Sequence, residues 1–319
     1  MSTLIVGAGL VGSQIARILV DRGERPLLMD HSPQPDALRE IVDLDRVDLV
    51  EGNVLRPLCL SQAIHQHGVT AIVHTAANPL LTLGAQRDPY AAIELNIMGS
   101  VNVLEAARVH GVKRVVIASS NVLNHFIAGG EGGGDPAQEE AFPRPTTFYA
   151  STKQAIESIG LNYARWSGIE FAAVRYGAVV GPWAGRGGGG PSNIVLDAVR
   201  RGLAGEEATI PASSLEWVYS RDAAAGTVLA LRAADLRTRV FNITMGRIVT
   251  AEEFAGALRA AIPGVRVRIE TAPRNAVAVP DMKHVSDLRL AREVLGYAPS
   301  YDMTAAVRDM VAWLKLRQN

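Results

Sequence analysis

The stretch Val6-Gly7-Ala8-Gly9-Leu10-Val11-Gly12 decides the fold of this chain. Its glycines have the spacing G-x-G-x-x-G, and it lies between an apolar run, Leu4–Val6, and residues that recur at helical spacing from Val11 to Leu19. In a strand, turn and helix of this kind, the first glycine permits a tight turn, the second admits a pyrophosphate, and the third lets the helix pack on the strand. The positive end of the helix dipole then faces the phosphates. The stretch therefore predicts a dinucleotide-binding turn.

An acidic residue supports this prediction. Eighteen residues beyond Gly12, the second apolar run ends in Asp30. A carboxylate at this place accepts hydrogen bonds from an adenosine ribose and repels the additional phosphate of NADP. We therefore expect NAD as the cofactor, with a solvated turn residue as the alternative for Asp30.

The rest of the first half repeats the pattern of an apolar run followed by a helical segment. Each run is short and continuously apolar, as in a strand covered on both faces. The runs are Leu4–Val6, Pro26–Met29, Ala71–Val73, Arg114–Ala118 and Phe171–Val174. This alternation predicts an α/β fold with a Rossmann-type, doubly wound parallel sheet.

After Arg175 the sequence becomes irregular and rich in Gly and Pro, which predicts a long loop and no new sheet. Val240–Ile243 predicts a further strand, and apolar residues from Val307 to Leu314 predict an amphipathic last helix. We expect residues 1–176 to form an NAD-binding Rossmann domain to which 212–248 return. Residues 177–211 and 249–319 are expected to form a smaller, discontinuous substrate-binding lobe.

Composition narrows the classes of partner. The chain has 319 residues, 48% of them hydrophobic, and its 32 Lys and Arg balance 32 Asp and Glu. Without a basic run or a long uncharged apolar stretch, we expect small-molecule partners, no nucleic acid, no membrane span and a cytoplasmic location. A single cysteine, Cys59, excludes an internal disulfide, and no metal site is expected from the spacing of the seven histidines.

The chemistry is expected at Ser120, Tyr149 and Lys153. Tyr149 and Lys153 are four residues apart and share a helix face, and Ser120 ends a predicted strand. An ammonium about 4 Å from a phenol is worth on the order of 4 kcal/mol, which lowers a tyrosine pKa toward neutrality and makes it a general base. A structural tyrosine–lysine pair and a serine strand cap are the alternatives.

On these motifs the chain resembles the extended short-chain dehydrogenase/reductase superfamily, in particular its NAD-dependent epimerase/dehydratase family. Further matching blocks are Gly52–Val54, His74–Ala77, Asn96–Glu105, Arg175–Pro182, Trp217–Asp222 and Leu295–Pro299. The resemblance implies that Ser120, Tyr149 and Lys153 are catalytic and suggests a homodimer. It also implies a cofactor site lined by Gly7, Gly9, Leu10, Val11, Gly12, Asp30, Asn53, Val54, Ala76, Ala77, Asn96, Tyr149, Lys153 and Tyr176.

The chain departs from this family where the family binds its substrates. Sugar-nucleotide enzymes of the family usually have Asn at the position of Ala178 and a polar group such as Arg at that of Leu215, and both normally hold the nucleotide diphosphate. Asn121 and Val122 stand in place of the Asp-Glu pair of the sugar dehydratases, so the acid and base needed for elimination are missing and we do not expect dehydration. The candidate substrate residues are Asn121, His125, Ala178, Arg186 and Leu215, although Arg186 on its glycine loop is alternatively only solvated.

Three functions remain open. The first is an NAD-dependent dehydrogenase that oxidises or reduces a secondary alcohol or ketone of a small substrate without a nucleotide. The second is an NAD-dependent sugar-nucleotide epimerase, which uses the same hydride chemistry but returns the hydride to the opposite face. The third is a noncatalytic dinucleotide sensor. Ala178 and Leu215 rank the dehydrogenase first, and the intact Ser-Tyr-Lys set ranks the sensor last.

Overall fold

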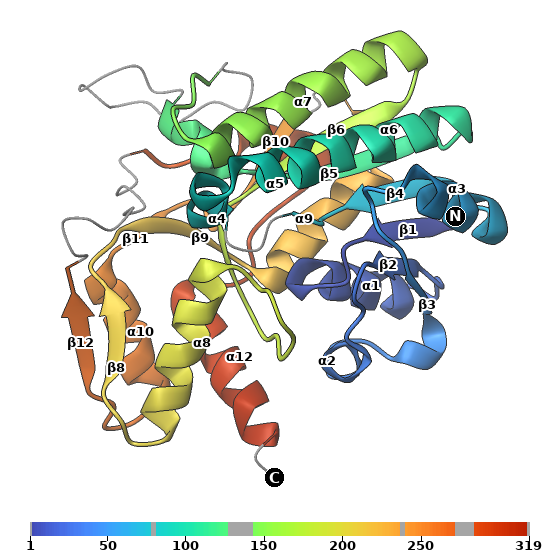
Figure 1. Ribbon diagram of the computed structural model, residues 1–319. Helices are drawn as coiled ribbons and strands as arrows, with labels where there is room; N and C mark the ends of the chain where they lie inside the picture. The colour runs from blue at the N-terminus through green and yellow to red at the C-terminus, as the bar shows by residue number, and fades with distance from the viewer. Residues whose placement is uncertain (1, 78–80, 127–142, 237–239, 272–283, 318–319) are drawn as a thin grey trace.

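The computed structural model describes residues 2–77, 81–126, 143–236, 240–271 and 284–317, without the side chains of 81–83 and 125–126. In these ranges the largest sheet has seven parallel strands in the order β10-β6-β5-β4-β1-β2-β3 (Figure 1). They are β1 (Thr3–Val6), β2 (Leu27–Asp30), β3 (Asp48–Glu51), β4 (Ala71–His74), β5 (Arg114–Ser120), β6 (Glu170–Tyr176) and β10 (Val240–Ile243). The expected parallel sheet is confirmed.

Both faces of this sheet are covered by helices because successive side chains of a strand point to opposite faces. In β1, Ile5 packs into one hydrophobic core, while Leu4 and Val6 pack into another. The first core holds α1 (Leu10–Asp21), α2 (Pro35–Arg39), α9 (Ser220–Arg232) and α11 (Arg289–Leu295). The second holds α3 (Pro57–His67), α6 (Gly99–Val109) and α7 (Phe148–Ser167). Shorter connecting helices are η1 (Leu44–Arg46), α4 (Leu81–Arg87), α5 (Pro89–Ile93), η2 (Glu94–Met98) and η3 (Asn121–Phe126).

Helix α7 lies unusually close to strand β6. A side-chain carbon at Gly160 would be only 2.1 Å from the ring of Phe171. The absence of a side chain at Gly160 therefore allows the Phe171 ring to pack directly against the helix backbone. This contact fixes α7 over the sheet, and with it the residues at the start of that helix.

A smaller lobe is built from short strands and three helices. In one sheet β9 (Leu215–Tyr219) pairs with β7 (Ala178–Val180) and β11 (Ile248–Val249), and in another β8 (Ala208–Pro211) pairs with β12 (Val267–Glu270). Helices α8 (Gly190–Leu203), α10 (Ala251–Ala261) and α12 (Met303–Leu316) pack around them in a separate core. The prediction of a long loop and no new sheet after Arg175 is therefore wrong. Strands β8 and β9 contain Thr209 and Glu216 and so lack a continuous apolar run, while β7 and β11 have only three and two residues.

The segment 212–248 contributes to both parts of the molecule. Strand β10 joins the central sheet beside β6, and α9 packs against α1. Strand β9, however, pairs with β7 of the lobe. The chain thus crosses between the two parts at the end of β9, and the lobe's sheet is held next to the carboxyl ends of the central strands.

The order of the strands also predicts where a ligand-binding crevice lies. Strand β1 lies between β4 and β2. From β1 the chain first adds β2 and β3 on one side, and then adds β4, β5 and β6 on the other side. In open parallel sheets, ligands bind outside the carboxyl ends of the strands at such a reversal. The residues that follow β1, β4 and β5 are therefore the ones to examine for a site.

Candidate active site

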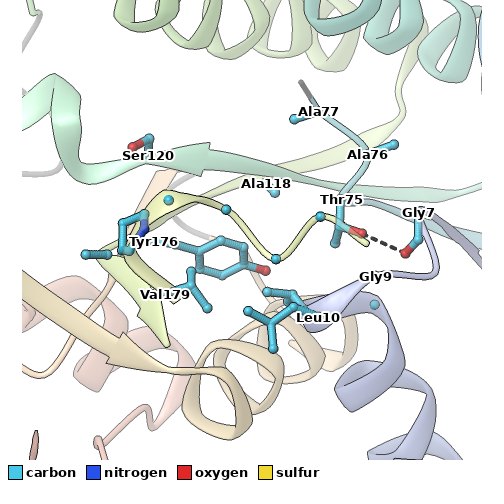
Figure 2. A pocket seen from close by; sticks show the side chains of 18 of the residues that line it. Gly7, Gly9, Leu10, Thr75, Ala76, Ala77, Ala118, Ser120, Tyr176 and Val179 are labelled. Carbon is cyan, nitrogen blue, oxygen red and sulfur yellow. Dashed lines mark hydrogen bonds between the residues drawn. The ribbon is translucent and has the colours of Figure 1, made fainter. Parts of the chain in front are cut away.

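A cavity of about 1110 Å³ lies at this crevice. Its walls come from the carboxyl ends of the central strands and from the lobe, including the start of α8 and the segment before β9. Figure 2 shows the labelled residues running from Ser120 at one end of the view to Gly7 and Gly9 at the other. A cavity of this size and length is large enough for a dinucleotide and a second, smaller ligand.

The glycine turn has the geometry that the sequence predicts. Gly7 has φ +104°, and an added side-chain carbon would be 2.7 Å from the backbone nitrogen of Ala76. At Gly12 such a carbon would be 1.9 Å from the carbonyl oxygen of Gly7. At Gly9 it would meet no heavy atom within 4 Å, although Gly9 lines the cavity. Gly7 and Gly12 thus close the turn, and Gly9 leaves the space that a pyrophosphate needs.

Asp30 faces the same cavity from the end of β2. One of its carboxylate oxygens accepts a hydrogen bond from Ala8 N–H at 2.9 Å, and the other accepts one from Ser32 N–H at 3.0 Å. Each carboxylate oxygen has a second lone pair. The carboxylate is therefore held in place by the backbone and still able to accept hydrogen bonds from the hydroxyls of a ribose.

Most of the other predicted cofactor residues line the cavity too. They are Leu10, Val11, Asn53, Val54, Ala76, Ala77, Tyr149, Lys153 and Tyr176. Asn96 is the exception, because its neighbours Glu94 and Leu95 line the cavity instead. The side chain of Asn96 is buried and donates a hydrogen bond to Thr152 at 3.1 Å. Asn96 thus lies between η2 and α7, behind the cavity wall, and its role toward the cofactor stays a prediction.

The three predicted catalytic residues meet at the other end of the cavity. Ser120 ends β5, and Tyr149 and Lys153 lie in the first turns of α7, which Thr147 caps by accepting a hydrogen bond from Ala150 N–H. The Ser120 hydroxyl is hydrogen-bonded to the phenol of Tyr149, which lowers the pKa of that phenol. Burial raises it more strongly, so that the pKa of Tyr149 is about 12.

The expected effect of the lysine on this tyrosine is not seen. The Lys153 ammonium donates a hydrogen bond to the carbonyl oxygen of Ala118 at 2.9 Å and lies 5.7 Å from the centre of the Tyr149 ring. Burial lowers the pKa of Lys153 to about 8, against the opposing effect of Glu157. In the protein without cofactor, burial thus raises the pKa of Tyr149, and the expected lowering by Lys153 stays a prediction.

The candidate substrate residues fall into two groups. Asn121, Ala178 and Leu215 line the end of the cavity near Tyr149 and the lobe. Arg186 lies at the opposite end, where its guanidinium donates to the Ser32 hydroxyl at 2.8 Å, two residues beyond Asp30. The chain folds this loop back over the end of β2, so Arg186 lines the cavity beside Asp30, and its contact with a substrate stays a prediction. His125 belongs to η3, and its side chain lies outside the described residues.

Sequence reasoning missed a buried ion pair behind Lys153. Both nitrogens of the Arg175 guanidinium fork, Nε and Nη2, donate to Glu157, at 2.9 and 2.7 Å. Ser119 donates to the same carboxylate at 2.5 Å. Glu157 is four residues after Lys153 and thus on the same helix face, and that spacing could have pointed to it.

A second buried carboxylate, Glu216, lies under the lobe side of the cavity. It accepts hydrogen bonds from Thr244 at 2.7 Å, from the backbone of Ser286 at 3.1 Å and from Asn121 at 3.4 Å. Burial raises the pKa of Glu216 despite these donors. Glu216 therefore holds Asn121, the residue directly after Ser120, in the floor of the site. No sequence spacing connects these two positions, which are 95 residues apart.

The structure gives no sign of a metal centre or a bilayer-spanning element in the part of the chain that it describes. Within those ranges, no three His, Cys, Asp or Glu side chains gather closely enough to bind a metal ion. None of the described helices has the length and the apolar character needed to cross a bilayer.

A parallel sheet with a glycine turn and an acidic residue after the second strand is typical of a dinucleotide-binding enzyme, and Ser120 beside the buried Tyr149 and Lys153 supplies groups for proton transfer. The model of the NAD dependent epimerase/dehydratase family matches residues 3–244, and the chain belongs to that family. It is an NAD-dependent enzyme, so the hypothesis of a noncatalytic sensor is wrong. The open space at Gly9 and the backbone-held carboxylate of Asp30 fit this cofactor.

Three relatives illustrate the range of the family. A UDP-glucuronate 4-epimerase of Arabidopsis thaliana is 26% identical over 98% of this chain and 71% of its own length. The structure of a Thermus thermophilus UDP-glucose 4-epimerase in complex with NAD has a TM-score of 0.82, with 27% identity over 99% of each chain. A GalE-like L-threonine dehydrogenase from Cupriavidus necator has a TM-score of 0.83, with 29% identity over 98% of this chain and 100% of its own. Taken with the other matching relatives, these findings favour the epimerase over the dehydrogenase that the sequence ranks first.

Proposed function

We propose that the protein is an NAD-dependent epimerase that inverts a secondary alcohol carbon of a sugar nucleotide. The observation that carries this proposal is the cavity itself. It joins a dinucleotide turn and a Ser-Tyr-Lys set to a second compartment walled by the lobe. Relatives that match nearly the whole chain are UDP-sugar epimerases, which supports the choice of substrate class.

The chain's own residues handle the proton. When bound, NAD supplies a nicotinamide ring that accepts a hydride from the alcohol carbon. Tyr149, ionised, takes the hydroxyl proton of the substrate, and Ser120 donates a hydrogen bond to the same oxygen. The ammonium of Lys153 and the positive charge of an oxidised nicotinamide both favour the phenolate, which burial alone disfavours.

Inversion requires the ketone to rotate in the site, so that its other face is presented, before it is reduced. Tyr149 would then return the proton to the oxygen as the carbon is reduced on its other face. The nucleotide part of the substrate has to stay bound during this rotation. The start of α8 lines the second compartment, and its backbone N–H groups and dipole favour a diphosphate there.

The test is to incubate the NAD-loaded protein with UDP-glucose, UDP-galactose and UDP-glucuronate and to follow the sugar C4 configuration by proton NMR. We expect conversion to the C4 epimer without net formation of NADH, measured at 340 nm. The absence of epimerisation for all three, with NAD bound, would contradict the proposal for UDP-sugars.

The dehydrogenase is the second candidate, and two positions favour it. Ala178 and Leu215 put apolar groups into the compartment where the resemblance implies polar anchors for a diphosphate. A compact, weakly charged alcohol fits such a wall better, because a buried unpaired charge costs several kcal/mol. Net release of NADH with a small alcohol, L-threonine included, together with no binding of UDP-sugars by calorimetry, would establish this function instead.

A homodimer is also proposed, from the family resemblance. Tyr90 on α5 and Met98 in η2 are large apolar side chains exposed on the monomer, which supports a partner on that side. Light scattering on the eluting protein gives its mass directly, and a mass of one chain at micromolar concentration would contradict the dimer.

A further inference from the structure

One segment of the cavity wall has no role in the proposed reaction. We call residues Trp183–Gly189, between β7 and α8, the strap. Figure 1 shows this yellow-green segment reaching away from α8 toward α1 and α2. The cavity is lined by Arg186–Gly189 of the strap on one side and by Asp30, Ser32 and Gln34 on the other. Asp30 marks the end where the adenosine of NAD binds, so the strap covers that half of the cofactor site.

The strap is closed by hydrogen bonds to a single glutamine. The side-chain oxygen of Gln34 accepts from Arg186 N–H at 2.6 Å, and its amide nitrogen donates to the Arg186 carbonyl oxygen at 3.3 Å. The amide of Gln34 thus pairs with both backbone groups of one residue, 152 positions away in the chain. The guanidinium of Arg186 adds a third bond, to the Ser32 hydroxyl at 2.8 Å.

The sequence of the strap is adapted to this closed position. A side-chain carbon at Gly185 would be 2.5 Å from the indole of Trp183 and 3.0 Å from the side-chain oxygen of Gln34. Gly187, Gly188 and Gly189 have φ values of 90°, 87° and 83°, which other residues rarely adopt. Trp183 is buried in the core beside α1 and donates its indole N–H to the Arg186 carbonyl oxygen at 3.1 Å. The base of the strap is therefore anchored, while its tip is closed by exposed hydrogen bonds.

We propose that Gln34 and the strap hold the adenosine half of NAD in its cleft and set the rate at which the cofactor enters and leaves. Exposed hydrogen bonds contribute little individually, so they can break and re-form while the protein stays folded. Retention suits an epimerase, which uses the same cofactor in every turnover. The proposal requires only that NAD binds in this cleft, and it does not depend on which substrate is converted.

The test measures cofactor exchange and not catalysis. Purified protein is loaded with NADH, and dissociation is followed by stopped-flow fluorescence after mixing with excess NAD; association is measured separately. Gln34→Ala removes both bonds to the strap backbone, Arg186→Ala removes only the bond to Ser32, and Gln62→Ala, on the exposed face of α3, is the matched control. We expect dissociation about 10-fold faster for Gln34→Ala, a smaller increase for Arg186→Ala and no change for Gln62→Ala.

The association rate separates a closing strap from an ordinary contact. A strap that gates the cleft slows both directions, so Gln34→Ala should accelerate association as well as dissociation, with an unchanged melting temperature for the protein without cofactor. Faster dissociation alone would make Gln34 a simple contact residue and overturn the gating role, and unchanged rates in both directions would overturn the proposal entirely.

Discussion

At the scale of single residues, the proton transfer depends on Tyr149. The phenol is buried and hydrogen-bonded to Ser120, and its pKa is about 12 without cofactor. Tyr149→Phe keeps the ring and removes the group that carries the proton. We expect turnover to fall by about 10²-fold to 10⁴-fold, with the dissociation constant of NAD changed little. Steady-state kinetics and calorimetry measure the two quantities, and nearly normal turnover would place the base elsewhere.

Lys153 gives a pH dependence of stability. Burial lowers its pKa to about 8 from the ordinary value of 10.5. Between these values the unfolded state binds more protons than the folded state, so the free energy of unfolding should rise with pH. Relative to Lys153→Met, the wild type without cofactor should gain about 2 kcal/mol between pH 8 and 9.5. Urea unfolding of both proteins at several pH values checks this. Parallel curves of the free energy of unfolding against pH would mean that folding does not lower the pKa of Lys153.

At the scale of elements, the strands of the central sheet could be predicted because they are continuous and apolar. Strand β3 was missed, since Asp48–Glu51 has acidic residues at both ends and lies half-buried at the sheet edge. The strands of the lobe were missed because β8 and β9 are interrupted by polar residues and β7 and β11 have only three and two residues. Residues on one motif, such as Tyr149 and Lys153, could be located from spacing, whereas the contact of Glu216 with Asn121 depends on how the lobe meets the sheet.

The glycine turn gives a prediction in which two neighbouring substitutions act differently. Gly12→Ala places a carbon 1.9 Å from the Gly7 carbonyl oxygen and should destabilise the protein by about 2 kcal/mol. Gly9→Ala meets open space, so the free energy of unfolding should change by less than about 0.5 kcal/mol. The new methyl group nevertheless lies where the pyrophosphate approaches, and NAD affinity should fall about 10-fold or more. Thermal melts and calorimetry on both variants distinguish the two effects; an unstable Gly9→Ala protein with normal NAD binding would be the opposite result.

The ion pair between Glu157 of α7 and Arg175 of β6 gives a further prediction. Glu157→Gln leaves the buried guanidinium of Arg175 without its carboxylate, and we expect a loss of about 3 to 5 kcal/mol in the free energy of unfolding. Because Glu157 raises the pKa of Lys153, the variant should also shift the pH profile of turnover that depends on this lysine. Glu170→Gln, whose carboxylate is half-exposed beside Arg114, is the control and should cost about 1 kcal/mol or less. Equal effects of the two substitutions would contradict a special role for the buried pair.

At the scale of the whole molecule, the cofactor cleft is bounded by the central sheet on one side and by the lobe and strap on the other. NAD bound there contacts both parts only when the chain is folded. At a free concentration of 100 times its dissociation constant, NAD should therefore raise the free energy of unfolding by about 2.7 kcal/mol. Calorimetric melts with increasing NAD test this, and in Gly9→Ala, with an affinity about 10-fold weaker, the effect at the same concentration should fall to about 1.4 kcal/mol.

The two ends of the cavity come from separate parts of the chain. Ser120, Tyr149 and Lys153 are fixed by β5 and by α7, whose distance from the sheet is set by the contact of Gly160 with Phe171. The wall that faces a substrate is formed by the lobe, through the start of α8, the segment before β9 and the start of α10. Mutations in the lobe can thus alter which alcohol is accepted without disturbing the group that removes its proton. A new specificity can arise in evolution, or in the laboratory, by exchanging these loops on an unchanged reactive framework.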